Sequence, residues 1–364
     1  MSYASLFVVK TLLLKAGVLS KNFWLKSFFK ELLLIHLANG EPFIMNNNLT
    51  PDELIDKAAW FQRDGKKEAA LQLLQTLFQY DLEAEILCRL GNLAVELGQL
   101  EQAEQIYKQA ILQGSQSSKA YVELGILYLE SSRYSLAIKL FQEALEIEET
   151  DYTYNFLGVA QDSLGMREEA RDSYTKALQL TPADEEVLYN LAFTWRSENP
   201  EKAIQLLNQS IQANPGYASA HRELGWMYLK TKEHAKAKNH LLKAVALNNK
   251  NGWSYIYLGL LLQEQRELQD AEEAFRTALK LWPDESVSHW TLGDLYWDQE
   301  RTEEARQLYE RAVELEPDDS QATHRLGLLL KAHGEIAQAK FYLEQTIVLD
   351  PDNEKAKAAL AELQ

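Results

Sequence analysis

Small residues return along this chain every 33 or 34 positions, each within the same pattern of apolar neighbours. A Leu precedes the small residue in eight of nine cases, and an Ala follows it 11 or 12 residues later. The nine small residues are Ala58, Gly91, Gly125, Gly158, Ala192, Gly225, Gly259, Gly293 and Gly327. Self-similarity at a fixed period of this length is the signature of a repeat array, in which each unit packs on its neighbours.

The spacing of apolar residues inside each interval predicts two helices. Large apolar side chains stand three and four residues from small ones, which places them on one helical stripe. Gly inside a helix costs roughly 1 kcal/mol relative to Ala, so its repeated use at one position indicates two backbones in close contact. Pro ends a helix because it lacks an N–H group and disfavours helix in the residue before it. Five intervals close in this way, at Pro182, Pro215, Pro283, Pro317 and Pro351.

This pattern resembles the tetratricopeptide repeat family, whose unit is a helix–turn–helix of about 34 residues. The resemblance implies an all-α, right-handed α-solenoid (superhelix) of antiparallel helix pairs. It spans residues 46–353 and divides them into nine units. The units are 51–83, 84–117, 118–150, 151–184, 185–217, 218–251, 252–285, 286–319 and 320–353.

The two ends of the chain differ from the repeats. Residues 354–364 place Ala356, Leu360 and Leu363 on one face, which is typical of the capping helix that covers the last unit of a solenoid. Residues 1–45 are apolar and basic, and Lys residues interrupt them too often for a membrane span of about 20 residues. Three interpretations stay open for this segment: a start of translation at Met45, a targeting or membrane-surface helix, or a helical cap on the first unit.

Charge and cysteine content narrow the classes of function. The formal net charge is −17, and residues 1–45 carry +3 (five Lys and two Glu), which leaves −20 for the remainder. Such an acidic body argues against nucleic-acid binding, because those proteins gain affinity by neutralising phosphates. Cys88 is the only cysteine, which excludes an intrachain disulfide or a multi-cysteine metal site and fits a reducing, cytoplasmic location.

The resemblance also indicates where partners bind, since in this family a stripe on the first helix of each unit lines a concave groove for partner peptides. The corresponding positions carry no aromatic residue in the first three units but many later. Large aromatic and Arg side chains dominate binding hot spots. The candidate groove residues are Tyr152, Tyr189, Phe193, Arg196, Arg222, Trp226, Trp253, Tyr257, Trp290, Trp297, His324 and Arg325.

Two other interpretations of these residues were open from sequence. Tight superhelical turns could bury the aromatic rings against the next unit and make them core. The family's known set of Lys, Asn and Arg residues for a partner's C-terminal carboxylate is incomplete here: Asn190 and Arg325 stand at suitable positions without their companions.

No motif for catalysis, metal binding or a cofactor occurs in the chain. The Gly-rich nucleotide loops, the nucleophile elbow and the HExxH metal motif are all missing. His221 and His289 fall at packing positions, and no carboxylate-supported His pair suggests zinc. We therefore expect no enzyme activity and no cofactor.

These observations predict a non-catalytic scaffold or adaptor that binds a peptide or helix of another protein in the concave groove. Two alternatives use other features: a membrane-associated assembly or secretion factor recruited through residues 1–45, with peripheral membrane location, or a carbohydrate or small-ligand binder on the groove aromatics. Contact with a membrane is expected only through residues 1–45. The sequence does not determine the oligomeric state.

Overall fold

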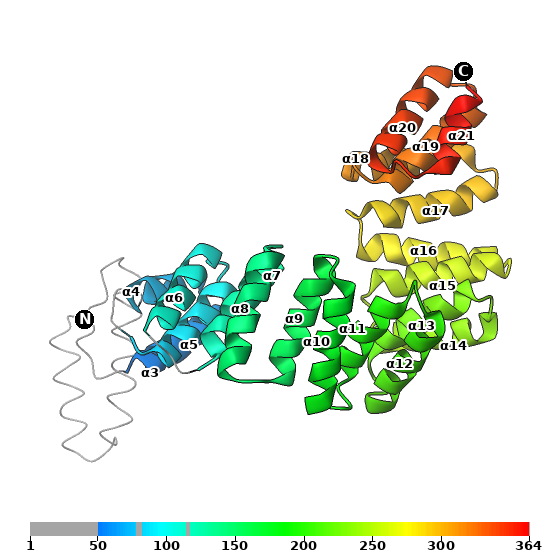
Figure 1. Cartoon of the computed structure of the whole chain (residues 1–364). Coiled ribbons are helices and arrows are strands. Elements are labelled where there is room, and N and C mark those ends of the chain that lie inside the picture. The colour runs from blue at the N-terminus through cyan, green and yellow to red at the C-terminus, as the bar shows by residue number, and fades with distance from the viewer. Residues whose placement is uncertain (1–49, 78–81, 114–116, 364) are drawn as a thin grey trace, which may run out of the picture. The chain divides into compact units, whose positions relative to one another are not determined.

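The computed structural model describes residues 50–77, 82–113 and 117–363 (Figure 1). Within these residues the chain forms nineteen α-helices and no strand. The predicted all-α fold of paired helices is therefore confirmed. The expectations for residues 1–45 lie outside the described residues.

The helices come in nine consecutive pairs followed by one single helix. Each pair consists of neighbours in sequence that pack side by side. The pairs are α3 Pro51–Arg63 with α4 Lys67–Leu77, α5 Ala84–Glu96 with α6 Leu100–Leu112, α7 Lys119–Glu130 with α8 Tyr134–Ile147, α9 Asp151–Ser163 with α10 Arg167–Leu180, α11 Glu185–Trp195 with α12 Pro200–Ala213, α13 Ala218–Lys230 with α14 His234–Leu247, α15 Gly252–Glu264 with α16 Leu268–Leu281, α17 Ser286–Asp298 with α18 Thr302–Leu315, and α19 Ser320–Ala332 with α20 Ile336–Leu349. The single helix α21, Glu354–Ala361, packs on α20.

Close approach of the two helices in a pair explains the recurring Gly. A Cβ added to Gly259 would lie 2.7 Å from the ring of Phe275, and one added to Gly293 would lie 2.6 Å from the ring of Tyr309. Both rings are buried. The small residue of the first helix thus makes room for the large apolar residue of the second, which is the contact that the spacing predicted.

Local signals set the helix ends. Thr50 and Glu53 form a reciprocal capping box at the start of α3, where Pro51 is the first helical residue. Asn199 caps α12 through a bond from the Lys202 amide, with Pro200 again in the first turn. Side-chain acceptors of this kind satisfy amide groups that have no partner inside the helix.

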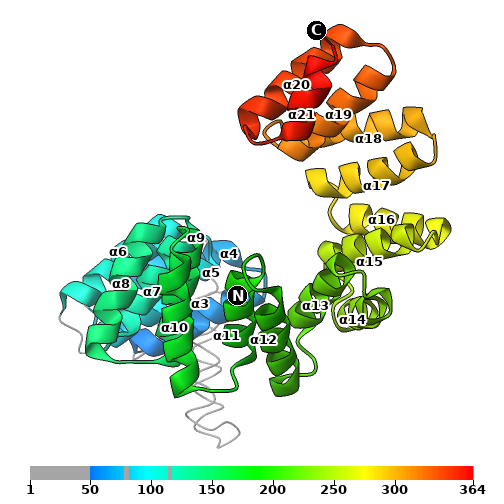
Figure 2. The same ribbon diagram turned by 45° about the vertical axis from the view of Figure 1, so that its right-hand side comes forward.

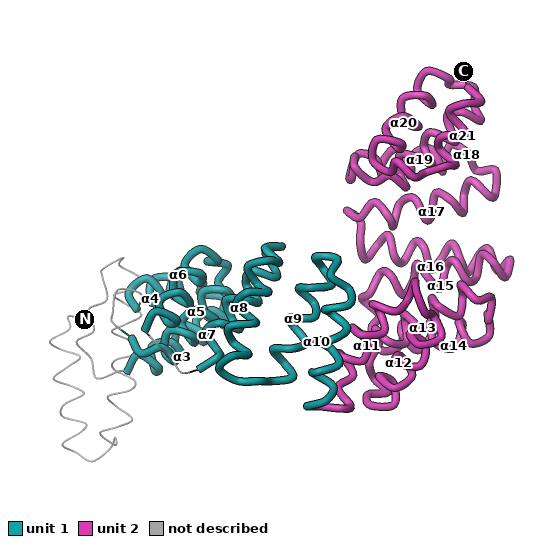
Figure 3. Tube along the Cα trace, in the orientation of Figure 1, with its two compact units in different colours: residues 1–180 teal, residues 181–364 magenta. Residues whose placement is uncertain are grey.

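The chain divides into two compact units, residues 1–180 and 181–364 (Figure 3). In the second unit the helix pairs from α13 to α20 stack one after another (Figure 2). A continuous apolar core runs through this unit from Ala192 to Ala339. One side of the first helix in each pair packs into this core. The side chains on its other side lie on the surface of the stacked pairs.

No helix among the described residues combines the length and apolar character that crossing a bilayer requires.

Candidate binding face

The predicted groove residues of the second unit lie on the first helices of their pairs. We call this surface the aromatic face. Its members are Tyr189, Phe193 and Arg196 at α11, Arg222 and Trp226 on α13, Trp253 and Tyr257 on α15, Trp290 and Trp297 on α17, and Arg325 on α19. Tyr152 lies on α9 of the first unit, where its ring meets the edge of Phe156.

Three aromatic side chains on neighbouring helices form a ladder at the centre of this face. Trp226 stacks on Tyr257 with ring centroids 4.6 Å apart, and Tyr257 is 5.6 Å from Trp253. The Trp226 and Tyr257 rings pack against the apolar core, whereas Trp253 is 38% exposed. Burial raises the pKa of Tyr257 to about 12, so its hydroxyl stays protonated and available as a donor at neutral pH.

Arg and Glu side chains frame one end of the ladder. Arg196 Nη1 lies 3.1 Å from Glu223 Oε1, and the Arg196 guanidinium covers the ring of Phe193 at 4.2 Å. Glu223 is only 3% exposed, so the ion pair offsets the cost of burying its charge. One helix along, Arg222 Nη2 donates to Tyr189 Oη at 3.0 Å.

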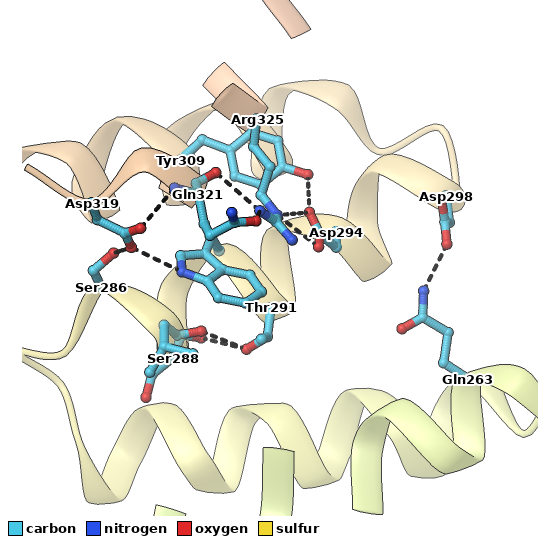
Figure 4. Close-up of polar contacts among 12 residues, drawn as sticks. Gln263, Ser286, Ser288, Thr291, Asp294, Asp298, Tyr309, Asp319, Gln321 and Arg325 are labelled. Carbon is cyan, nitrogen blue, oxygen red and sulfur yellow. Dashed lines mark hydrogen bonds and ion pairs between the residues drawn. The ribbon is translucent and has the colours of Figure 1, made fainter. Parts of the chain in front are cut away.

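A second network holds Trp290 in place. Arg325 lies 3.9 Å above the Trp290 ring, and its Nε donates to both oxygens of Asp294 at 2.8 Å. Tyr309 Oη donates to Asp294 as well, while the indole Nε1 donates to Asp319 at 3.1 Å (Figure 4). Burial raises the pKa of Asp294, and the charge of Arg325 opposes that shift. Trp290 and Arg325 therefore have their own partners in the structure.

An open groove of about 830 Å³ runs beside the ladder, along the C-terminal ends of α13, α15 and α17. Trp226 and Trp297, together with three leucines, form its apolar lining. Charged residues of both signs also line it, and the cations among them include Lys230 at the end of α13 and Lys232 and Arg266 in the turns after α13 and α15. Of these lining residues, Trp226 and Trp297 were predicted from the sequence, and Lys230, Lys232 and Arg266 were not.

The structure contradicts one predicted groove residue. His324 is 8% exposed, and burial lowers the pKa of its imidazole. Its side chain is therefore buried and is not presented to a partner. His221 and His289 are buried as expected from their packing positions.

From the sequence, the aromatic residues could be either buried core or an accessible surface, and the structure shows members that are partly buried and members that are exposed. Tyr189, Trp226, Tyr257, Trp290 and Trp297 pack against the core with part of each ring still accessible. Phe193 and Trp253 are exposed at 41% and 38%. The rings are thus neither wholly core nor wholly free.

Sequence reasoning missed several residues that shape this face. Lys230 Nζ lies 4.4 Å above the Trp226 ring, and Glu223 and Arg266 were not singled out. Lys230 could have been found from its spacing, because it stands four residues after Trp226 on the same helical face. The roles of Glu223 and Arg266 depend on how neighbouring helix pairs pack.

Within the described part of the chain, no three His, Cys, Asp or Glu side chains gather in a way that could hold a metal ion.

Comparison with known proteins agrees with this repeat architecture. Three family models, each described as Tetratricopeptide repeat, match residues 88–152 and 258–320, 194–254, and 152–184. Together they cover more than half of the chain. The chain belongs to the tetratricopeptide repeat family. Tetratricopeptide repeat proteins in general act as protein-interaction scaffolds, and this chain has their fold.

This tetratricopeptide repeat protein is similar to parts of longer proteins and to a solved structure. It is 29% identical over 46% of its length to Protein O-mannosyl-transferase TMTC1 of Homo sapiens, and 25% identical over 61% to the BBSome complex member BBS4 homolog of Drosophila melanogaster. It spans only 20% and 47% of those two proteins. The crystal structure of the APC/C hetero-tetramer Cut9-Hcn1 is similar with a TM-score of 0.59 at 15% identity, covering 86% of this chain and 67% of that one, which shows the fold alone.

Proposed function

We propose that this protein is a non-catalytic scaffold that binds a peptide or helix of another protein on the aromatic face of its second unit. The observation that carries the proposal is the ladder of Trp226, Tyr257 and Trp253, in which two large rings pack against the core and the third is 38% exposed on the same face. Rigid aromatic anchors bind strongly because they bury much area and lose little side-chain entropy.

The arrangement of the rings favours a protein segment over a carbohydrate. A sugar would stack on an open ring face, yet Tyr257 and Lys230 lie against the ring of Trp226, and Arg325 covers a face of Trp290. A peptide can use apolar contacts and polar groups along a groove, and this face combines partly buried rings with charged groove residues. Titration with oligosaccharides, followed by Trp fluorescence, is expected to give no saturable change.

Mannosyl transfer is no part of this proposal. TMTC1, the relative whose name includes that activity, is matched by this chain over only a fifth of the length of TMTC1.

The membrane-associated alternative depends on residues 1–45, and the cytoplasmic location proposed here depends on charge and cysteine usage alone. Flotation of the full chain with anionic liposomes, compared with a chain lacking residues 1–44, separates the two locations.

The test of the binding face is a double substitution, Trp226→Ala with Trp253→Ala. We expect proteins that co-purify with the wild-type chain from its native host to be lost, with helicity by circular dichroism unchanged. Phe341→Ala is the matched control, because Phe341 is a similarly large ring that is 55% exposed on α20, a second helix of a pair. If every co-purifying protein stays bound to the double variant, the aromatic face is not the binding site.

A further inference from the structure

Three cations on or beside the aromatic face make no ion pair within the described part of the chain: Arg222, Lys230 and Arg266. Arg222 donates to the neutral hydroxyl of Tyr189 at 3.0 Å. Lys230 lies 4.4 Å above the Trp226 ring and has no carboxylate within ion-pair distance among the described residues. Arg266 lines the groove at the turn after α15. Each is therefore able to accept an anion without breaking an existing pair.

The acidic residues of the same region are, by contrast, mostly neutralised. Each of three carboxylates has a cationic partner within 3.1 Å, and a fourth accepts from an amide. The pairs are Glu223 with Arg196, Glu264 with Lys232 and His234, Asp294 with Arg325, and Asp298 with Gln263. Asp298 and Asp319, which accepts from the Trp290 indole, have no cationic partner among the described residues, so three unpaired cations stand against these two carboxylates, although the whole chain carries a net charge of −17.

The unpaired cations are also aligned with the aromatic ladder. Arg222, Trp226 and Lys230 stand at successive intervals of four residues on α13, so they lie along one side of that helix. The rise of 1.5 Å per residue separates the backbone positions of Arg222 and Lys230 by about 12 Å along the helix axis. The Lys230 ammonium itself lies over the Trp226 ring, 4.4 Å from its centre, so both cations belong to the side of α13 that carries the central tryptophan.

From these observations we infer that the segment bound on the aromatic face is acidic: a peptide of another protein whose side-chain carboxylates flank an apolar or aromatic residue. The apolar residue meets Trp226 and Trp253, and the carboxylates meet Arg222, Lys230 and Arg266. The inference rests on the proposed function, because it names the chemistry of the partner at that same face.

A random 16-residue peptide library displayed on phage tests this directly. The full chain is expected to enrich peptides with more Asp and Glu, and less Lys and Arg, than the input library. The enriched peptides are then synthesised with an amidated C-terminus and measured by fluorescence anisotropy. Replacing one of their Glu residues by Gln should weaken binding by about fivefold, the effect of one partly screened ion pair, and raising NaCl from low to high concentration should weaken it further.

Two matched triple variants control for folding and net charge. Arg222→Gln, Lys230→Gln and Arg266→Gln together remove the unpaired cations. Lys250→Gln, Lys280→Gln and Lys355→Gln change the net charge equally at exposed positions off this face. Only the first variant should lose the preference for acidic peptides, with thermal unfolding of both close to wild type.

The outcomes distinguish this inference from the proposed function. If enriched peptides depend on Trp226 and Trp253 but are not acidic, the charge inference is wrong and the binding face stands. If enrichment is unchanged by Trp226→Ala with Trp253→Ala, or no peptide is enriched, the proposed function fails and the inference with it. If amidation abolishes binding, the recognised group is a terminal carboxylate, which overturns the assignment to side chains.

Discussion

Four residues other than glycine adopt the left-handed backbone conformation among the described residues: Ser132, Lys232, Arg266 and Glu300. All four stand at the turn between the two helices of a pair, where Gly65, Gly98, Gly165 and Gly334 stand in other pairs. A side chain with a Cβ is strained in this conformation, and Gly is not. At the residue scale, therefore, some repeats carry a Cβ atom at a turn position where the left-handed backbone conformation favours Gly.

Replacing Glu300 by Gly should therefore stabilise the second unit. We expect a gain of about 0.5 to 1 kcal/mol, which is the relief of left-handed strain less the extra entropy that Gly loses on folding. Glu300 is exposed, so few contacts are given up. Thermal unfolding followed by circular dichroism should show a rise in Tm. Gly334→Ala, the reverse change at the equivalent turn, should lower it. A lower Tm for Glu300→Gly would contradict this account.

Helix pairs are the elements of this fold, and each depends on a small residue opposite a large one. Gly225 faces Leu241, Gly259 faces Phe275 and Gly327 faces Leu343, with hypothetical Cβ distances from 2.5 to 3.0 Å. The fifth pair carries Ala192 instead, and both Ala192 and Leu207 are buried. In this pair the methyl group of Ala192 is thus accommodated within the buried core that also contains Leu207.

Gly259→Ala should destabilise the protein even though Ala is the better helix former. The added methyl gains roughly 1 kcal/mol in helix propensity, but overpacking against the buried ring of Phe275 costs typically 1 to 3 kcal/mol. A lower midpoint in urea unfolding is the expected result. Combining it with Phe275→Leu, which imitates the Ala192 and Leu207 pair, should give less destabilisation than the sum of the two changes. Strict additivity would show that the two residues are not coupled.

The pair α13 and α14 also contains two imidazoles in direct contact. His221 Nε2 donates to the Pro215 carbonyl at 3.2 Å, so its neutral ring offers Nδ1 as acceptor to His240 Nδ1–H at 3.0 Å. Burial lowers the pKa of His240 to about 4, helped by the charges of His221 and Lys243, and it lowers the pKa of His221 as well. The folded protein therefore favours the neutral form of both imidazoles.

Acidification should weaken this helix pair. Between about pH 6.5 and pH 4 the unfolded imidazoles bind protons that the folded ones do not, so the free energy of unfolding falls as the pH falls through this range. The loss is on the order of 1 kcal/mol, because His240 is only partly buried and solvent screens its charge. Tm measured at pH 7, 6, 5 and 4.5 should decline less steeply in His240→Gln than in wild type. An equal slope in both would refute the role of the pair, and the exposed His333→Gln is the control for removing any histidine.

At the scale of the whole molecule, an array of stacked pairs leaves an apolar surface at its end. In this chain α21 covers α20: Leu343, Ala356 and Ala359 are buried together, with Leu360 and Leu363 packed beside them. Open solenoids need such a cap because the last unit has no neighbour to bury its core face. The predicted packing of residues 354–364 on the last repeat is thus seen in the contacts of α21.

Deleting residues 354–364 should lower Tm and promote self-association, because Leu343 and its neighbours become exposed. Thermal unfolding and size-exclusion chromatography measure the two effects. Glu354→Gln with Lys357→Gln is the matched control, since it removes only an exposed ion pair and leaves α21 in place. An unchanged Tm and elution volume after the deletion would mean that α21 contributes no cap.

Sequence by itself determined the period, the helix pairs and the faces on which aromatic residues stand. These features follow from spacings of three, four and about 34 residues, which depend on helix geometry and are therefore local. Tertiary structure decided the rest: that His324 is buried, that Arg325 pairs with Asp294, and that Arg222 and Lys230 have no carboxylate partner among the described residues. Such contacts join side chains about one repeat apart, and whether they form depends on how each helix pair is rotated against the next.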